Sequence, residues 1–223
     1  MKTPVIIVNF KTYGEVMGPH GLELAKTCAR VAWETGASIA IAPQNVDLGL
    51  VCREVKIPVL AQHADDVGPG SHTGHTSPNA VKAAGAAGTL INHSEYKIAH
   101  SDVKGVIERC RELGLVSVAC ADNLEETEAL AWFKPDYIAV EPPELIGGNV
   151  SVTSAKPEVV SSSVEVVRSI DPNVKVLCGA GVKTMEDVRK AIELGTVGVL
   201  LASGVVKAQN PGKVLMELVD GLR

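Results

Sequence analysis

Four polar side chains stand directly after short apolar runs of the chain: Asn9, Lys11, His93 and Glu141. A carboxylate that ends an apolar run, as Glu141 does, loses contact with water, and this raises its basicity. Asn9 and Lys11 are two residues apart, so in extended chain both point the same way and offer an amide and an ammonium to a polar or anionic ligand. A Schiff-base role for Lys11 also fits. The structural alternatives are a solvated lysine, a hydrogen-bonded histidine and an ion-paired glutamate.

Two turns of small residues follow later apolar runs, Gly-Ala-Gly at 179–181 and Ala-Ser-Gly at 202–204. Small side chains leave backbone N–H groups accessible, which is how barrel loops often bind phosphate. Between the two sets, residues 142–148 read Pro-Pro-Glu-Leu-Ile-Gly-Gly. Stiff residues at one end and flexible ones at the other are typical of a lid with two hinges, although an ordinary rigid loop has the same pattern.

The elements that must position these residues are eight short runs, nearly all apolar and rich in β-branched residues. They are Val5–Val8, Ser38–Ala42, Pro58–Ala61, Gly88–Ile91, Leu115–Ala119, Tyr137–Val140, Val174–Leu177 and Val197–Leu201. Continuously apolar strands of this length are typical of a parallel sheet covered on both faces. Because the polar residues follow these runs, they would gather at one mouth of a barrel.

Amphipathic helical patterns lie between the runs. The clearest are Leu22–Trp33, Val103–Leu113, Glu125–Phe133, Pro157–Ile170, Met185–Leu194 and Gly212–Leu222. The alternation predicts an α/β fold, a (β/α)₈ TIM barrel that spans residues 1–223 as a single domain. A doubly wound open sheet is the alternative, but it favours a glycine-rich turn after the first strand, where residues 9–11 read Asn-Phe-Lys.

Smaller patterns give further expectations. Ser101 and Asp102 predict the start of the Val103–Leu113 helix. Thr184, three residues before an aspartate, predicts a capping box. Ser94 and Glu95 predict the cap and first turn of a short helix, whose dipole would help to keep His93 neutral. The two tryptophans, at 33 and 132, occupy apolar helix positions and are expected in the core or an interface.

Composition excludes several classes of partner. The 21 Lys and Arg against 26 Asp and Glu give a net charge of −5, which disfavours nucleic-acid binding. Five cysteines without a C-x-x-C pair disfavour a disulfide framework and favour a cytoplasmic setting. No apolar run approaches the ~18 residues of a membrane span. His72 and His75 lack a third ligand nearby in the sequence, so no metal site is expected.

Three segments together carry a family resemblance: Val-Asn-Phe-Lys at 8–11, Asn-His-Ser-Glu at 92–95 and Val-Glu-Pro-Pro at 140–143. In this order they resemble triosephosphate isomerase over the whole chain, and GSHTGH, VEPPELIG, VLCGAGV and GVLLASGVVKA are similar to its compact archaeal branch. The resemblance implies interconversion of dihydroxyacetone phosphate and D-glyceraldehyde 3-phosphate by proton transfer through an enediolate, with no cofactor and no metal. It also implies a homo-oligomer, a dimer or a tetramer.

The resemblance also implies a role for each residue. Glu141 would be the base, His93 the neutral electrophile, Lys11 the positive charge beside phosphate and enediolate, and Asn9 a donor to substrate oxygen. Backbone N–H groups would hold the phosphate at Gly147, Gly181, Ala202 and Ser203. Glu95 would hold the lysine, with Ser94 beside it. Thr73, on loop Gly68–Thr76, would reach the neighbouring subunit near its Lys11.

Two other functions compete with isomerisation. One is a barrel aldolase that acts on phosphorylated sugars through a Schiff base on Lys11. The other is a catalytically silent barrel that serves as a binding protein, although every catalytic position implied by the resemblance is filled.

Overall fold

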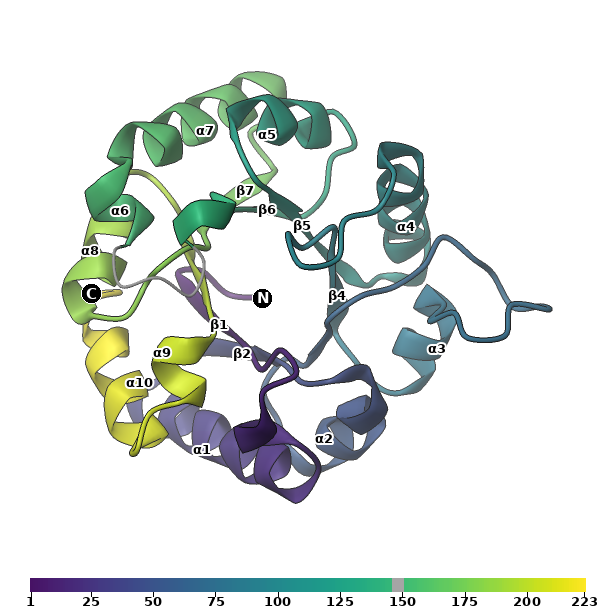
Figure 1. Cartoon of the computed structure of the whole chain (residues 1–223), viewed down its shortest axis with the longest axis horizontal. Coiled ribbons are helices and arrows are strands. Elements are labelled where there is room, and N and C mark those ends of the chain that lie inside the picture. The colour runs from purple at the N-terminus through teal and green to yellow at the C-terminus, as the bar shows by residue number, and fades with distance from the viewer. Residues whose placement is uncertain (146–150) are drawn as a thin grey trace.

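The computed structural model describes residues 1–145 and 151–223. Eight parallel strands form its centre: β1 (Val5–Asn9), β2 (Ser38–Ala42), β3 (Leu60–Ala61), β4 (Gly88–Ile91), β5 (Val116–Ala121), β6 (Tyr137–Val140), β7 (Lys175–Cys178) and β8 (Gly198–Leu201). Their order is β2-β1-β8-β7-β6-β5-β4-β3, and a bridge between Ile41 and Val59 joins the two edge strands into a nearly closed barrel (Figure 1). The predicted barrel is confirmed and the doubly wound sheet is wrong.

Helices surround the strands on the outside of the barrel (Figure 1). They are α1 (Pro19–Thr35), α2 (Leu48–Glu54), α3 (Pro78–Ala83), α4 (His100–Leu113), α5 (Leu124–Ala131), α6 (Val152–Ala155), α7 (Pro157–Ile170), α8 (Met185–Glu193), α9 (Ser203–Val206) and α10 (Pro211–Asp220). Three 3₁₀ turns accompany them, η1 (Gly14–Val16), η2 (Asn45–Asp47) and η3 (Pro143–Leu145). The capping box at the start of α8 is confirmed, with Thr184 and Asp187 bonding reciprocally.

The core has two parts, because each strand buries both of its faces. Side chains such as Ile7, Leu90 and Leu177 fill the barrel interior, whereas Ile6 and Ile91 pack outward against the helices. This arrangement explains why the strands are continuously apolar in sequence rather than alternating. It also makes the strand ends, where the apolar runs stop, the natural place for polar groups.

Two local predictions are wrong. Ser94 and Glu95 form a turn, closed by the Tyr96 N–H donating to the His93 carbonyl at 2.7 Å, and not the start of a helix. The next helix, α4, starts at His100, earlier than its predicted cap, because Ala99 already has the extended backbone of an N-cap residue.

The two tryptophans are also placed differently from a core position. Trp33 is 84% exposed and Trp132 is 63% exposed in the isolated chain. Trp33 lies in α1 and Trp132 directly follows α5, and these helices bury smaller side chains such as Ala25 and Leu130 against the barrel instead. A core position is therefore wrong for both tryptophans, and an interface position stays a prediction.

One segment projects from the ring of helices, between β3 and α3 (Figure 1). Residues 69–75, which include Thr73, are exposed along it. At its base Asp65 and Thr76 share two hydrogen bonds. The Asp65 backbone N–H donates to the Thr76 carbonyl at 2.8 Å, and the Asp65 carboxylate accepts the Thr76 N–H at 2.6 Å. Within the part of the chain that the structure describes, no helix is both long and apolar enough to span a membrane.

Candidate active site

Asn9 and Lys11 lie where β1 ends. Asn9 is buried, and its side-chain oxygen accepts the Lys11 backbone N–H at 2.9 Å. Lys11 has a φ of +49°, a left-handed conformation that costs energy for a residue with a side chain. A second bond, from the Gln62 side-chain amide to the Lys11 carbonyl at 2.9 Å, holds this turn in place. The strained backbone lets both side chains face the same mouth of the barrel.

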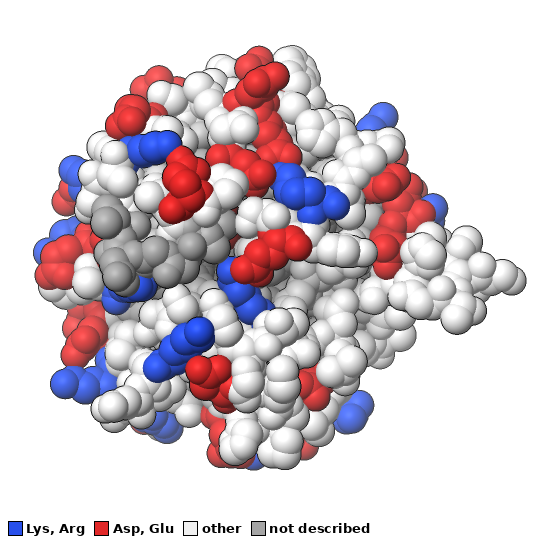
Figure 2. All heavy atoms as spheres, in the orientation of Figure 1, with Lys and Arg blue, Asp and Glu red and all other residues white. Residues whose placement is uncertain are grey.

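The Lys11 ammonium is fixed by an ion pair. Its Nζ atom lies 2.7 Å from Oε1 of Glu95, and the lysine side chain is only 10% exposed. Acidic and basic side chains stand close together near the middle of this face of the molecule (Figure 2). The ion pair therefore holds the Lys11 ammonium at the barrel mouth, where it lines both hollows of the site.

His93 follows β4 and is buried at 7% exposure. Its Nδ1 accepts the backbone N–H of Glu95 at 3.2 Å, so the proton of the neutral ring belongs on Nε2. Burial, with the Lys11 charge as a second cause, lowers the pKa of His93 from 6.5 to about 4. The predicted neutral imidazole thus arises from burial and a neighbouring cation, not from a helix dipole.

Glu141 follows β6 and is almost fully buried. Burial raises the pKa of its carboxyl from 4.5 to about 8, although a hydrogen bond with Cys120 and the Lys11 charge act in the opposite direction. The Oε2 atom of Glu141 has no hydrogen-bond partner among the described residues and lies 3.6 Å from Nε2 of His93. A carboxyl group and a protonated imidazole nitrogen therefore face one another at the barrel mouth.

The small-residue turns belong to the same place. One pocket is lined by Glu141, Asn9 and Lys11 together with the two turns, contributing Gly179, Gly181, Ala202, Ser203 and Gly204. A neighbouring hollow contains His93 and Glu95 and shares Asn9 and Lys11 with the first. The site is thus continuous from the imidazole to the turns after β7 and β8.

Ser94 is half-buried beside His93 in the turn after β4. Thr73 is on the projecting segment and is exposed in the isolated chain. Gly147 lies outside the described residues.

Other residues at the site were missed from the sequence. Tyr13 and Lys183 also line the pocket, and both lie beyond the strand ends where polar residues were sought. Asn92 has a φ of +61° directly before His93. An asparagine before a turn was the signal that could have indicated this backbone conformation.

This arrangement suits proton transfer on a small anionic molecule. A desolvated carboxylate can take a proton from carbon, and an imidazole Nε2–H with an ammonium beside it can stabilise the resulting oxyanion. Within the described ranges, no group of three or more His, Cys, Asp or Glu side chains is arranged to bind a metal.

Several known proteins are similar to this chain in sequence. A family model described as triosephosphate isomerase matches residues 4–221. The chain belongs to the triosephosphate isomerase family.

It is 51% identical to the triosephosphate isomerase of Methanocaldococcus jannaschii over 215 residues, covering 96% of this chain and 98% of that one. It is 49% identical to the triosephosphate isomerase of Methanothermus fervidus over 219 residues, covering 98% and 99%. That of Methanothermobacter thermautotrophicus is 51% identical over 218 residues, covering 98% and 95%. Membership of the triosephosphate isomerase family agrees with the eight-stranded barrel and with the resemblance to the archaeal branch.

Proposed function

We propose that this chain interconverts dihydroxyacetone phosphate and D-glyceraldehyde 3-phosphate, as an intramolecular aldose–ketose isomerase that needs no cofactor. The observation that carries the proposal is the 3.6 Å approach of His93 Nε2 to Glu141 Oε2 at the barrel mouth. Family membership and the names of the relatives support it.

Glu141 acts as the base in this proposal. A proton on carbon next to a carbonyl is only weakly acidic, so its removal needs a basic carboxylate. Such a carboxylate must lie in a site from which water is excluded, because hydration lowers its basicity. Burial raises the pKa of Glu141 to about 8, so its ionised form is a stronger base than an ordinary carboxylate, and it is this ionised form that takes the proton. It takes the proton from one carbon and returns it to the neighbouring carbon, which converts the ketose into the aldose.

His93 acts as the electrophile. Since its Nδ1 accepts the Glu95 N–H, its Nε2–H faces the site and can donate to the substrate oxygens. The low pKa of His93 keeps the ring neutral, so it can exchange protons between the two oxygens of the enediolate.

Lys11 and Asn9 complete the oxyanion site. The ammonium of Lys11, held by Glu95, stabilises negative charge on the enediolate and the phosphate, and Asn9 donates to substrate oxygen. The backbone N–H groups of Gly181, Ala202 and Ser203 bind the phosphate from the turns after β7 and β8, and Gly147 is proposed to add another.

The same reaction belongs to glycolysis and gluconeogenesis, so we place the protein in the cytoplasm. The five cysteines, all within the described residues, are free, as expected for a reducing compartment. Small-molecule chemistry and a net charge of −5 leave no role for nucleic acid or membrane partners.

A homo-oligomer is proposed as well, a dimer at least and a homotetramer by similarity to the archaeal branch. The projecting segment carries Thr73 outward, and the hollow beside Lys11 exposes Tyr96 and Val46 to receive such a segment from a second copy. Light scattering of the wild type and of Thr73→Arg tests this. The wild type should exceed its 23.3 kDa chain mass at least twofold, and the variant should dissociate.

A coupled assay from each triose phosphate tests the activity directly. Turnover in both directions is expected, and no turnover above buffer would favour the catalytically silent barrel. Borohydride trapping with dihydroxyacetone phosphate tests the aldolase alternative, which predicts a covalent adduct on Lys11.

A further inference from the structure

Asn92, the residue before His93, is held by three hydrogen bonds of its side chain. Asn92 is 1% exposed and has a left-handed backbone, with φ of +61°. Its side-chain nitrogen donates to the Cys120 carbonyl at 3.1 Å and to Oε1 of Glu126 at 2.9 Å. Its side-chain oxygen accepts the Ile98 N–H at 3.1 Å. The turn that carries His93 is thus bonded at both of its ends through one side chain.

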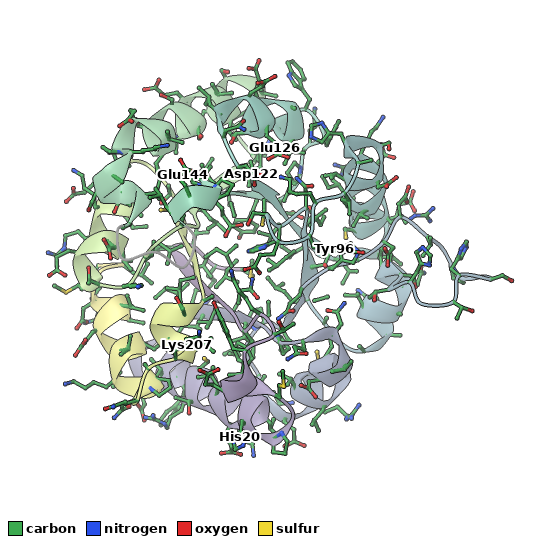
Figure 3. The ribbon with its side chains drawn as sticks, in the orientation of Figure 1. His20, Tyr96, Asp122, Glu126, Glu144 and Lys207 are labelled. Carbon is green, nitrogen blue, oxygen red and sulfur yellow. The ribbon has the colours of Figure 1, made fainter. Side chains whose placement is uncertain are left out.

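Glu126, in the first turn of α5, is the centre of this network. Its carboxylate also accepts the Asp122 N–H at 2.7 Å and both of its oxygens lie within 2.7 Å of Nζ of Lys97. Its side chain is 12% exposed. Figure 3 shows Asp122 and Glu126 near one another at the start of α5. One carboxylate therefore joins three donors from the segments that follow β4 and β5.

The network reaches both partners of the proposed proton transfer. On one side it fixes Asn92, which is bonded to His93 by a single peptide link. On the other side it fixes Asp122, next to Ala121, whose carbonyl accepts the Glu141 N–H at 2.8 Å. A shift of Glu126 would therefore change the relative position of imidazole and carboxyl.

We infer that Glu126, acting through Asn92 and Lys97, is a positioning residue that holds the His93 ring against Glu141. This inference rests on the proposed isomerase function. Groups that orient a catalytic side chain act on rate because a misplacement of about 1 Å can lower it roughly 10²-fold.

The electrostatics of Glu126 are consistent with this role. Burial raises its pKa, but hydrogen bonds from Lys97, the Asp122 N–H and Asn92 act more strongly together, so the net pKa is lowered. The carboxylate is charged and accepts from every donor at once. A glutamine there would turn an NH₂ group toward one of these donors and leave the network with two opposed N–H groups.

The test compares Glu126→Gln with Glu125→Gln, a matched change at the adjacent, exposed position of α5. We expect kcat of Glu126→Gln to fall between about tenfold and a hundredfold, with KM within about twofold, because the phosphate-binding turns after β7 and β8 are untouched. Glu125→Gln should keep both constants. A KM change equal to the loss in kcat, or an unchanged kcat, would overturn the inference.

A second pair covers the case in which Glu126→Gln unfolds. Lys97 is at the surface side of the network, with a side chain 34% exposed, so its variants should fold. Lys97→Met should lower kcat several-fold, whereas Lys97→Arg should restore it by keeping the charge and the donors. Equal kcat in both variants would contradict the inference. The wild-type assay separates the two proposals. If the wild type shows no turnover, the isomerase function is refuted. If the wild type turns over and the variants keep its kcat, only the positioning role is refuted.

Discussion

Gly179 lies directly against the side chain of Glu141. A Cβ atom placed on Gly179 would stand 2.3 Å from Cγ and 2.9 Å from Cδ of Glu141, far inside van der Waals contact. The two residues follow adjacent strands, since the Gly179 N–H donates to the Val140 carbonyl at 2.9 Å. The absence of a side chain after β7 therefore makes room for the carboxyl group after β6.

The first prediction follows from this contact. Gly179→Ala should displace the Glu141 carboxyl and lower kcat at least tenfold, by the same reasoning that a shift of about 1 Å can reduce rate roughly 10²-fold. Steady-state kinetics measure it. Gly14→Ala is the matched control, because a Cβ there meets no atom within 4 Å. Full activity of Gly179→Ala would show that the carboxyl can work from another position.

The second prediction concerns the base itself. Glu141→Gln should reduce kcat by roughly 10²–10⁴-fold, the usual contribution of a positioned general base. Binding of phosphoglycolate, measured by calorimetry, should persist because the protein groups that bind the phosphate and the oxyanion are unchanged. Glu158→Gln, an exposed change on α7, provides the control. Near-normal turnover of Glu141→Gln would mean that a different group removes the proton.

The third prediction concerns stability and pH. Folded Glu141 holds its proton up to about pH 8, whereas its ordinary pKa is 4.5, so folded wild type loses stability as pH rises across that interval. At about 1.4 kcal/mol per pKa unit, the free energy of unfolding lost between pH 4.5 and pH 8 is on the order of a few kcal/mol.

Glutamine has no proton to lose, so Glu141→Gln should match the wild type near pH 4 and become progressively more stable than it up to about pH 8, above which the difference should stay constant. Denaturant unfolding of both proteins at several pH values measures this difference. A difference that stays constant with pH would indicate that Glu141 titrates normally in the folded chain.

The fourth prediction concerns the turn after β7. Gly181 has a φ of +71°, a conformation that asparagine and aspartate tolerate best among residues with side chains. Gly181→Asn and Gly181→Asp have the same shape and differ in charge. If this turn binds phosphate, KM should rise at least tenfold more in Gly181→Asp than in Gly181→Asn, by charge repulsion. Equal KM values would remove Gly181 from the phosphate site.

The sequence by itself determined the eight strands and the residues that end them. Strands such as Tyr137–Val140 are buried on both faces, so each is an unbroken apolar run whose ends can be read from the sequence. Glu141 is the first polar residue after that run. The order of Asn9, His93 and Glu141 along the chain was enough to indicate the family.

Only the tertiary structure decided how these residues work together. The neutral state of His93 depends on burial and on a cation 82 positions away along the chain, whereas local sequence suggested a helix that does not form. Likewise, Glu126 and Gly179 bear on the site through contacts between neighbouring loops. Such contacts depend on strand order and register, which bring distant segments together and which no local pattern encodes.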